Sequence, residues 1–154
     1  SGNGFSYAFE EGILRKYAVF GIHESYNTEN VVKKFDNDKE FLYYNTFEDM
    51  FIRETLGFQQ GMDDCQNFCK DNYCGIELDL DAITNVPSSA KTSSGLSPVQ
   101  ARQYVYRSAK NLNACYLHIA EGAPVLAHIK ADNKTGKLIA YLVTDFIKGC
   151  MDKS

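Results

Sequence analysis

The sequence predicts an α/β fold in which helices cover both faces of a mostly parallel sheet, forming a three-layer α/β/α sandwich. Short, continuous apolar runs alternate along the chain with longer stretches of helical pattern. Continuous apolar runs are typical of strands buried on both faces, and strands that alternate with helices build parallel sheets. With 154 residues and 44% hydrophobic content, we expect one compact domain over residues 1–154.

Four apolar runs are the predicted strands, at residues 17–22, 40–44, 74–80 and 114–120. A loop rich in Ser, Thr, Gly and Pro follows the third strand at residues 84–97. In parallel sheets, ligands bind beyond the carboxyl ends of the strands. We therefore expect this loop to contact a ligand, although a solvated connection has the same composition.

Helical patterns occupy the intervals between the strands and the end of the chain, at residues 28–35, 46–71, 97–111 and 135–151. Thr28, Thr46 and Ser97 stand where N-caps are expected, and Pro98 is at a first helical position. The last helix is predicted to be amphipathic.

Composition excludes several classes of partner. A net charge of −4 argues against a nucleic-acid surface, and no apolar run approaches the roughly 18 residues that span a bilayer. Five cysteines, without a secretory signal pattern, indicate a reduced, cytoplasmic protein with buried free thiols. Cys65 and Cys69 have the spacing of half a zinc site, but no second Cys/His pair follows them.

The most informative stretch is GIELDLDAI, residues 75–83, because it reads as a buried strand that carries three acids. Glu77, Asp79 and Asp81 alternate with apolar residues, so they are expected on one side of the strand. Adjacent buried carboxylates need a counter-charge, and Mg²⁺, Ca²⁺ or Mn²⁺ prefers such oxygen ligands. The alternative is an edge strand whose acids face water.

Another acid follows the fourth predicted strand, at Glu121. A carboxylate at a strand end suits a planar guanidinium or amidinium group, which it binds through two parallel hydrogen bonds. An ordinary solvated or helix-capping glutamate is the alternative at this position.

The runs GIELDLDAITNVPSSAKTSSGLS, YLHIAEGAP and GKLIAYLVTDFIKG resemble the arginase/agmatinase/formimidoylglutamase family of ureohydrolases, most of all its formimidoylglutamase-like members. The opening SGNGFSYAF also resembles a Ser-Gly-Asn loop of that family. The resemblance implies an arginase-like fold that is incomplete here, because the chain corresponds to the C-terminal part of the single family domain.

The resemblance also implies a binuclear Mn²⁺ hydrolase of linear amidines or guanidino compounds, in which a hydroxide bridging the metal ions attacks the C=N carbon. Asp79 and Asp81 match metal ligands, and Glu121 matches the acid that contacts the amidinium end of the substrate. Ser1 and Asn3 match a loop that binds the other end of a small guanidino or formimidoyl amino-acid substrate. No catalytic residue is assigned within this chain.

Several departures from the family pattern bear on these assignments. Glu77 replaces a serine, the Asp-Pro that usually follows the aspartates is absent, and Gly4 and Phe5 stand where arginases carry a histidine. The remaining family ligands, a histidine and an Asp-x-His-x-Asp cluster, belong upstream of the Ser-Gly-Asn loop. His23, His118 and His128 do not match them. We therefore expect the isolated chain to bind Mn²⁺ weakly and to be inactive.

Two other functions stay open. A non-catalytic arginase-fold protein could serve as a binding or assembly subunit, and a flavodoxin-like signalling domain also clusters acids at strand ends around Mg²⁺. The signalling domain is disfavoured because no matching lysine ends a strand here. Whether the protein is a homo-oligomer also stays open.

Overall fold

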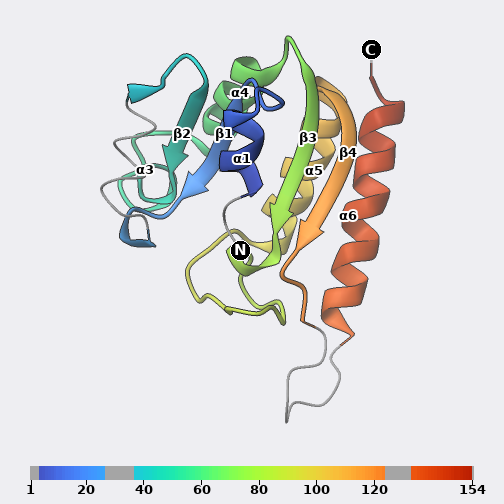
Figure 1. Cartoon of the computed structure of the whole chain (residues 1–154). Coiled ribbons are helices and arrows are strands. Elements are labelled where there is room, and N and C mark those ends of the chain that lie inside the picture. Colours follow the sequence, from blue (N-terminus) through green and yellow to red (C-terminus); the bar gives the residue numbers. More distant parts are fainter. Residues whose placement is uncertain (1–3, 27–36, 124–132, 154) are drawn as a thin grey trace. The chain divides into compact units, whose positions relative to one another are not determined.

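The structure is a computed structural model that describes residues 4–26, 37–123 and 133–153 (Figure 1). The chain is α/β, and the strand pairs within these ranges run parallel, which confirms the predicted fold class. The residues group into two compact units, Ser1–Cys69 and Lys70–Ser154, and each unit contains one strand pair. The organisation of residues 1–154 as a single domain stays a prediction.

The first unit pairs β1 (Tyr17–Ile22) with β2 (Leu42–Thr46) and packs α4 (Phe58–Cys69) against both strands. The short helix α1 (Gly4–Glu10) precedes β1, and the 3₁₀ turn η1 (Glu24–Tyr26) follows it. Helix α3 (Phe47–Phe51) begins directly after β2.

The buried side chain of Asn45 holds the first unit together. Its amide nitrogen donates to the carbonyl of Gly61 at 2.8 Å and to the sulfur of Cys65 at 3.4 Å. Its carbonyl oxygen accepts from the backbone nitrogen of Gly21 at 2.9 Å. One satisfied amide therefore joins β1, β2 and α4 at a point where an unpaired polar group would be costly.

The second unit is a βαβ element extended by a helix. Its elements are β3 (Tyr73–Asp79), the 3₁₀ turn η2 (Leu80–Ala82), α5 (Pro98–Asn111), β4 (Asn113–Ala120) and α6 (Lys134–Met151). The apolar side chains of β3 and β4 pack with those of both helices into one core, whose buried members are Leu78, Leu80, Ile83, Val86, Ala101, Val105, Leu138 and Leu142. A parallel sheet with helices packed on it needs this alternation of strand and helix.

Local signals explain why the helices begin where they do. Ser97 caps α5, and with Gln100 it forms a complete capping box, while Pro98 occupies the first helical position. Thr46 caps α3 by accepting from the backbone nitrogen of Asp49 at 3.0 Å. The predicted N-caps at Ser97 and Thr46 and the predicted amphipathic final helix are confirmed.

The structure corrects some predicted boundaries. The helix predicted over residues 46–71 is two helices, because Glu54 adopts a left-handed φ of 54° between α3 and α4. The strand predicted at 40–44 runs from Leu42 to Thr46, and α1 was not predicted. The helix expected to begin at Thr28 lies outside the described residues.

The described helices include none that is long and apolar enough to cross a membrane. Helix α6 nevertheless exposes large apolar side chains away from the core, including Val143, Ile147 and Met151.

Replacing Leu142 with alanine should remove about 2–5 kcal/mol from the free energy of unfolding, because its side chain has 0% exposure in the core of the second unit. Urea titration followed by circular dichroism measures this loss. The matched control is Lys137→Ala on the exposed side of the same helix, which should change the free energy by no more than about 0.5 kcal/mol. Equal effects of the two substitutions would contradict the described core.

Candidate functional site

The acidic strand β3 ends at Asp79, and this ending shapes the candidate site. The carboxylate of Asp79 accepts a hydrogen bond from the backbone nitrogen of Asp81 at 2.8 Å, and the chain turns there into η2. Asp81 therefore lies in a 3₁₀ turn, so the expectation that it shares the strand with Glu77 and Asp79 is wrong. A short polar side chain that caps the next turn competes with continued strand pairing.

The side chain of Ser89 connects Asp81 with Glu121. Its hydroxyl lies 2.9 Å from Oδ2 of Asp81 and 2.5 Å from Oε2 of Glu121, and the backbone nitrogen of Ala90 donates to Oδ1 of Asp81 at 2.8 Å. Because a hydroxyl has one proton, Ser89 can donate to only one carboxylate at a time. The structure thus places the acids of two strand ends around one serine.

The loop that carries Ser89 is fixed to the end of β4. Ser88 forms an antiparallel bridge with Gly122, and the backbone nitrogen of Ser89 donates to the carbonyl of Glu121 at 3.0 Å. Thr135, at the start of α6, donates from its hydroxyl to the carbonyl of Pro87 at 2.9 Å. The loop is therefore held by the backbone of β4 and by a buried side chain of α6.

Two backbone positions in this region are strained or crowded. Glu121 has a φ of 62°, a left-handed conformation that costs a non-glycine residue about 1–3 kcal/mol. At Gly95, a Cβ atom would lie 2.5 Å from the carbonyl oxygen of Ala82, so only glycine fits where the loop returns past η2. The surrounding hydrogen bonds maintain the conformation that points Glu121 at Ser89.

The carboxyls have pKa values shifted in opposite directions. Burial raises the pKa of Asp79 in spite of the hydrogen bond from Asp81, and the charges of Asp81 and Glu121 raise it further. Burial would also raise the pKa of Asp81, but hydrogen bonds from Ala90 and Ser89, together with the nearby hydroxyl of Ser88, outweigh it, and the pKa is lowered. The ionised form of Asp79 is thus disfavoured by its surroundings, whereas that of Asp81 is stabilised.

Ser88 contributes to this environment from a buried position. Its hydroxyl makes no hydrogen bond of normal geometry within the described residues, although it still helps to lower the pKa of Asp81.

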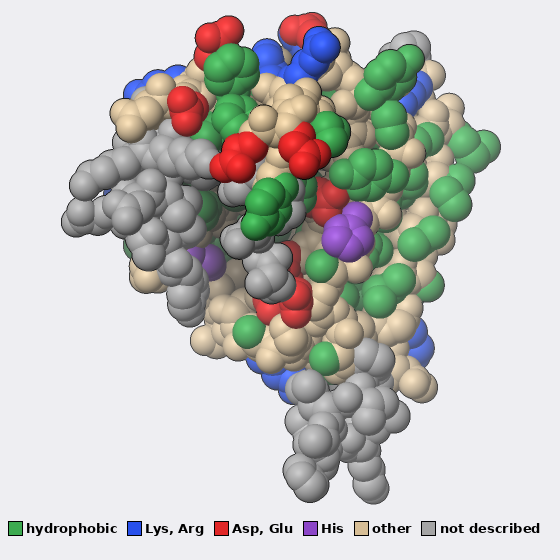
Figure 2. Space-filling model, viewed as in Figure 1, with side chains coloured by type: hydrophobic (Ala, Val, Ile, Leu, Met, Phe, Trp, Pro, Cys, Tyr) green, Lys and Arg blue, Asp and Glu red, His purple; other side chains and the backbone are tan. Residues whose placement is uncertain are grey.

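Figure 2 shows acidic side chains gathered over the carboxyl ends of β3 and β4 on the viewed face. No ion pair within the described ranges involves Asp79, Asp81 or Glu121.

The third acid of the strand, Glu77, has a partner of its own. It lies opposite His118 in the register of β3 and β4, and Nδ1 of His118 is 2.5 Å from Oε2 of Glu77. A side-chain hydrogen bond to Glu77 also raises the pKa of Tyr116 to about 12. Glu77 is therefore bound by β4 side chains, while Asp79 is not.

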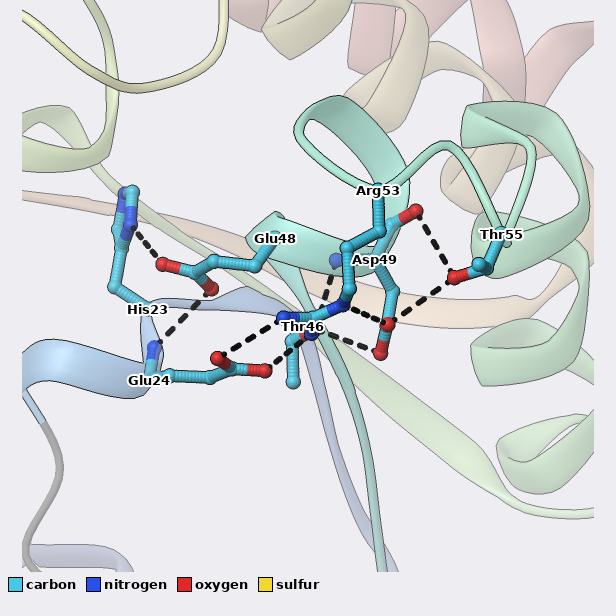
Figure 3. A network of polar contacts seen from close by, with 7 residues as sticks. All are labelled: His23, Glu24, Thr46, Glu48, Asp49, Arg53 and Thr55. Carbon is cyan, nitrogen blue, oxygen red and sulfur yellow. Dashed lines mark hydrogen bonds and ion pairs between the residues drawn. The ribbon is translucent and has the colours of Figure 1, made fainter.

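His23, in the first unit, is held in a polar network that Figure 3 shows. Its Nδ1 lies 3.3 Å from Oε1 of Glu48, and its ring packs on Phe47 with centroids 4.4 Å apart. Arg53 joins the same network through Glu24 and, at 2.9 Å, through Asp49. These contacts agree with a structural role for His23.

Some predicted site residues lie outside the described ranges, namely Ser1, Asn3 and His128. None of the five cysteines, which all lie within the described ranges, takes part in a disulfide. The expectation that the thiols are buried holds for Cys65 and Cys74 but is wrong for Cys115, which is exposed. No group of three or more His, Cys, Asp and Glu side chains that could hold a metal ion occurs among residues 4–26, 37–123 and 133–153.

The sequence did not single out Ser89. The available signal was the composition of the loop at residues 84–97 and its place after the acidic strand, which predicted ligand contact for the loop as a whole. Several serines and threonines in this loop are equivalent by composition. Only the bridge between Ser88 and Gly122 selects Ser89 as the one that faces both carboxylates.

No family model and no curated protein matches the sequence. Solved structures do match the fold. A formimidoylglutamase from Bacillus subtilis superposes with a TM-score of 0.80 at 19% identity, over 97% of this chain and 46% of that chain. A hypothetical agmatinase from Burkholderia thailandensis gives 0.68 at 18% identity, over 94% of this chain and 42% of the other.

An arginase from Helicobacter pylori gives a TM-score of 0.63 at 18% identity, over 86% of this chain and 43% of that chain. The chain thus spans less than half the length of each of these proteins. At such identities the likeness is one of fold. The chain has the fold of these structures over less than half of their length.

Replacing Asp79 with asparagine should raise the free energy of unfolding at pH 7. The pKa of Asp79 is raised in the folded state, so its ionised form opposes folding above that pKa. The gain should shrink as the pH falls toward about 4, the ordinary range of an aspartate. Urea titrations over this pH range measure the difference.

Asp81→Asn is the matched comparison, and the opposite sign is expected. The pKa of Asp81 is lowered, so its ionised form stabilises the fold, and this contribution is lost as the pH falls through the folded pKa. Destabilisation by both substitutions at pH 7 would contradict the opposite pKa shifts of the two aspartates.

Proposed function

We propose that this chain supplies one side of the active site of a manganese-dependent hydrolase that acts on linear amidines or guanidino compounds. The substrate class is that of formimidoylglutamase, arginase and agmatinase, and the reaction is hydrolysis of a C–N bond outside a peptide. A small guanidino or formimidoyl amino acid is the proposed substrate, and the cytoplasm is the proposed location.

One observation carries the proposal, namely that Asp79, Asp81 and Glu121 come together at the carboxyl ends of two parallel strands. Asp81 and Glu121 share the hydroxyl of Ser89, and both raise the pKa of Asp79. Such a cluster lacks a counter-charge within the described residues, and a cation would remove the repulsion. The fold likeness to a formimidoylglutamase, an agmatinase and an arginase supports the same class of chemistry.

The donor atoms of Asp79 and Asp81 fit manganese as part of a ligand set. Carboxylate oxygens suit Mn²⁺, and the negative charge on Asp79 favours a cation. Two aspartates are too few for a tight binuclear site, and the described residues contain no larger metal-binding group. When bound, the metal pair would polarise the C=N bond and lower the pKa of water.

The residues of this chain would orient the substrate. The carboxylate of Glu121 can accept two parallel hydrogen bonds from an amidinium or guanidinium group. Ser89 would hold Glu121 in place by donating to Oε2, while the backbone of Ala90 keeps Asp81 directed into the site. Ser1 and Asn3 are proposed to bind the amino-acid end of the substrate.

The remaining metal ligands are proposed to come from a longer protein that contains this chain. The matched structures are more than twice as long as the part that this chain covers, which supports this view. The isolated chain should therefore bind Mn²⁺ weakly and turn over no substrate, because metal affinity follows the number and geometry of ligands.

The test compares the isolated chain with a longer protein that contains it. Manganese content after equilibrium dialysis and hydrolysis of formimidoylglutamate, arginine and agmatine are measured for both. We expect a manganese pair and turnover of one substrate only in the longer protein. In that protein, Asp81→Asn should release manganese, whereas Asp152→Asn, which removes an acid bound to Tyr106, should leave the metal content unchanged.

Rapid hydrolysis by the isolated chain would contradict the proposal that the active site is completed by ligands from the rest of a longer protein. If both proteins contained no metal and turned over no substrate, the enzyme proposal would be overturned. That outcome would favour the alternative function, a non-catalytic arginase-fold subunit for binding or assembly. The presence of Glu77, where the family pattern has a serine, is compatible with this alternative.

A further inference from the structure

Two cysteines stand side by side at the amino-terminal ends of β3 and β4, away from the candidate site at the carboxyl ends. Cys74 pairs with Ala114, and the next registered pair is Gly75 with Tyr116. Cys115 is therefore the extra residue of a β-bulge, level with the bond between Cys74 and Gly75. A bulged residue has no partner of its own in the ladder of backbone hydrogen bonds.

The register brings the backbones of the two cysteines within the reach of a disulfide. Cys74 lies on the core side of β3 with the buried residues Ile76 and Leu78, while the bulge interrupts the alternation of β4 at Cys115, whose side chain is exposed. Neighbouring strands are about 4.8 Å apart, and Cys115 is offset along the strand by about half of the 3.3 Å rise per residue, so the two cysteine Cα atoms are expected to be about 5 Å apart. Disulfides bridge Cα separations of about 4.4–6.8 Å.

The charge of Cys115 also affects the thiol of Cys74. Burial raises the pKa of Cys74, and the Coulombic effect of Cys115 raises it further, as expected of close neighbours. Cys115 is exposed to solvent, while Cys74 is 9% exposed. An oxidant can therefore reach Cys115 first, and Cys74 lies next to it as a resolving thiol.

We propose that Cys74 and Cys115 form a redox modification site, which a peroxide oxidises to a disulfide between β3 and β4. The thiolate of Cys115 attacks the peroxide oxygen, which yields a sulfenic acid and releases water from a hydrogen peroxide molecule. The sulfur of Cys74 then attacks the sulfenic sulfur, and a second water molecule leaves as the S–S bond forms. Two thiols lose two hydrogens and two electrons in total, and the peroxide accepts them.

The disulfide would connect the two strands that carry the candidate site without reaching the site. It would close a loop that includes Asp79, Asp81 and Ser89, and such closure restricts the unfolded chain. Oxidation should therefore raise the thermal midpoint of unfolding. Because Cys74 must lose its proton to attack, the second step should become faster as the pH rises.

The test treats the chain with hydrogen peroxide and counts free thiols in denaturant. Two of the five thiols should disappear, the intact mass should fall by two hydrogen atoms, and a non-reduced digest should contain a peptide pair joined through Cys74 and Cys115. A reductant such as dithiothreitol should restore all five thiols. Cys115→Ser, a substitution at an exposed position, should prevent the cross-link, and Cys150→Ser should leave it intact.

The alternative products overturn the proposal in distinct ways. A cross-link between Cys65 and Cys69, the other close pair in the chain, would place the oxidation in α4. A disulfide between two copies through Cys115, or oxygen added to Cys115 while Cys74 stays free, would show that Cys74 cannot act as its partner. Circular dichroism of Cys115→Ser before oxidation separates loss of the cross-link from loss of folding.

Discussion

The parallel register of β3 and β4 is the constraint on which the candidate site depends. Pairing of Asp79 with Ala120 brings the last residue of β3 level with the residue before Glu121, so that both acids leave the sheet at one edge. A crossover through α5 is what permits two consecutive strands to run parallel, and the capping box at Ser97 fixes where that helix begins. The acids therefore meet because of a fold that is stabilised elsewhere, in the core around Leu78, Val105 and Leu142.

Taken alone, the candidate site lowers the free energy of unfolding. Three carboxylates lie near one another, Glu121 itself has a left-handed backbone conformation, and the hydroxyl of Ser89 can donate to only one acid at a time. Local strain and like charges persist where the surrounding structure determines the conformation, and they are most frequent at functional sites. Here the bridge between Ser88 and Gly122 and the bond from Thr135 to Pro87 provide that support.

Much of the fold could be predicted because local signals and packing agree. β1 was placed at its observed bounds, and the predicted bounds of β3 and β4 differ from the observed ones by one residue, because apolar runs reflect burial. The break between α3 and α4 could not be predicted, because Glu54 and its neighbours carry no strong helix-ending signal apart from Gly57. At the candidate site, Asp79 and Asp81 were selected from their spacing and Glu121 from its place after a predicted strand, and their roles stay predictions. Ser89 and the turn at Asp81 depend on hydrogen bonds between distant segments, which spacing does not encode.

The three acids of the GIELDLDAI stretch do not have the same need for a cation. Glu77 faces His118 directly across the sheet and also binds Tyr116, so β4 already supplies its partners. Asp81 accepts hydrogen bonds from Ser89 and Ala90 that lower its pKa. Of the two aspartates, only Asp79 has a raised pKa. It is partly buried, and it lies near the charges of Asp81 and Glu121. A cation at this end of the sheet would therefore act first on Asp79, and the pairing of Glu77 with His118 would keep the third acid out of the coordination set.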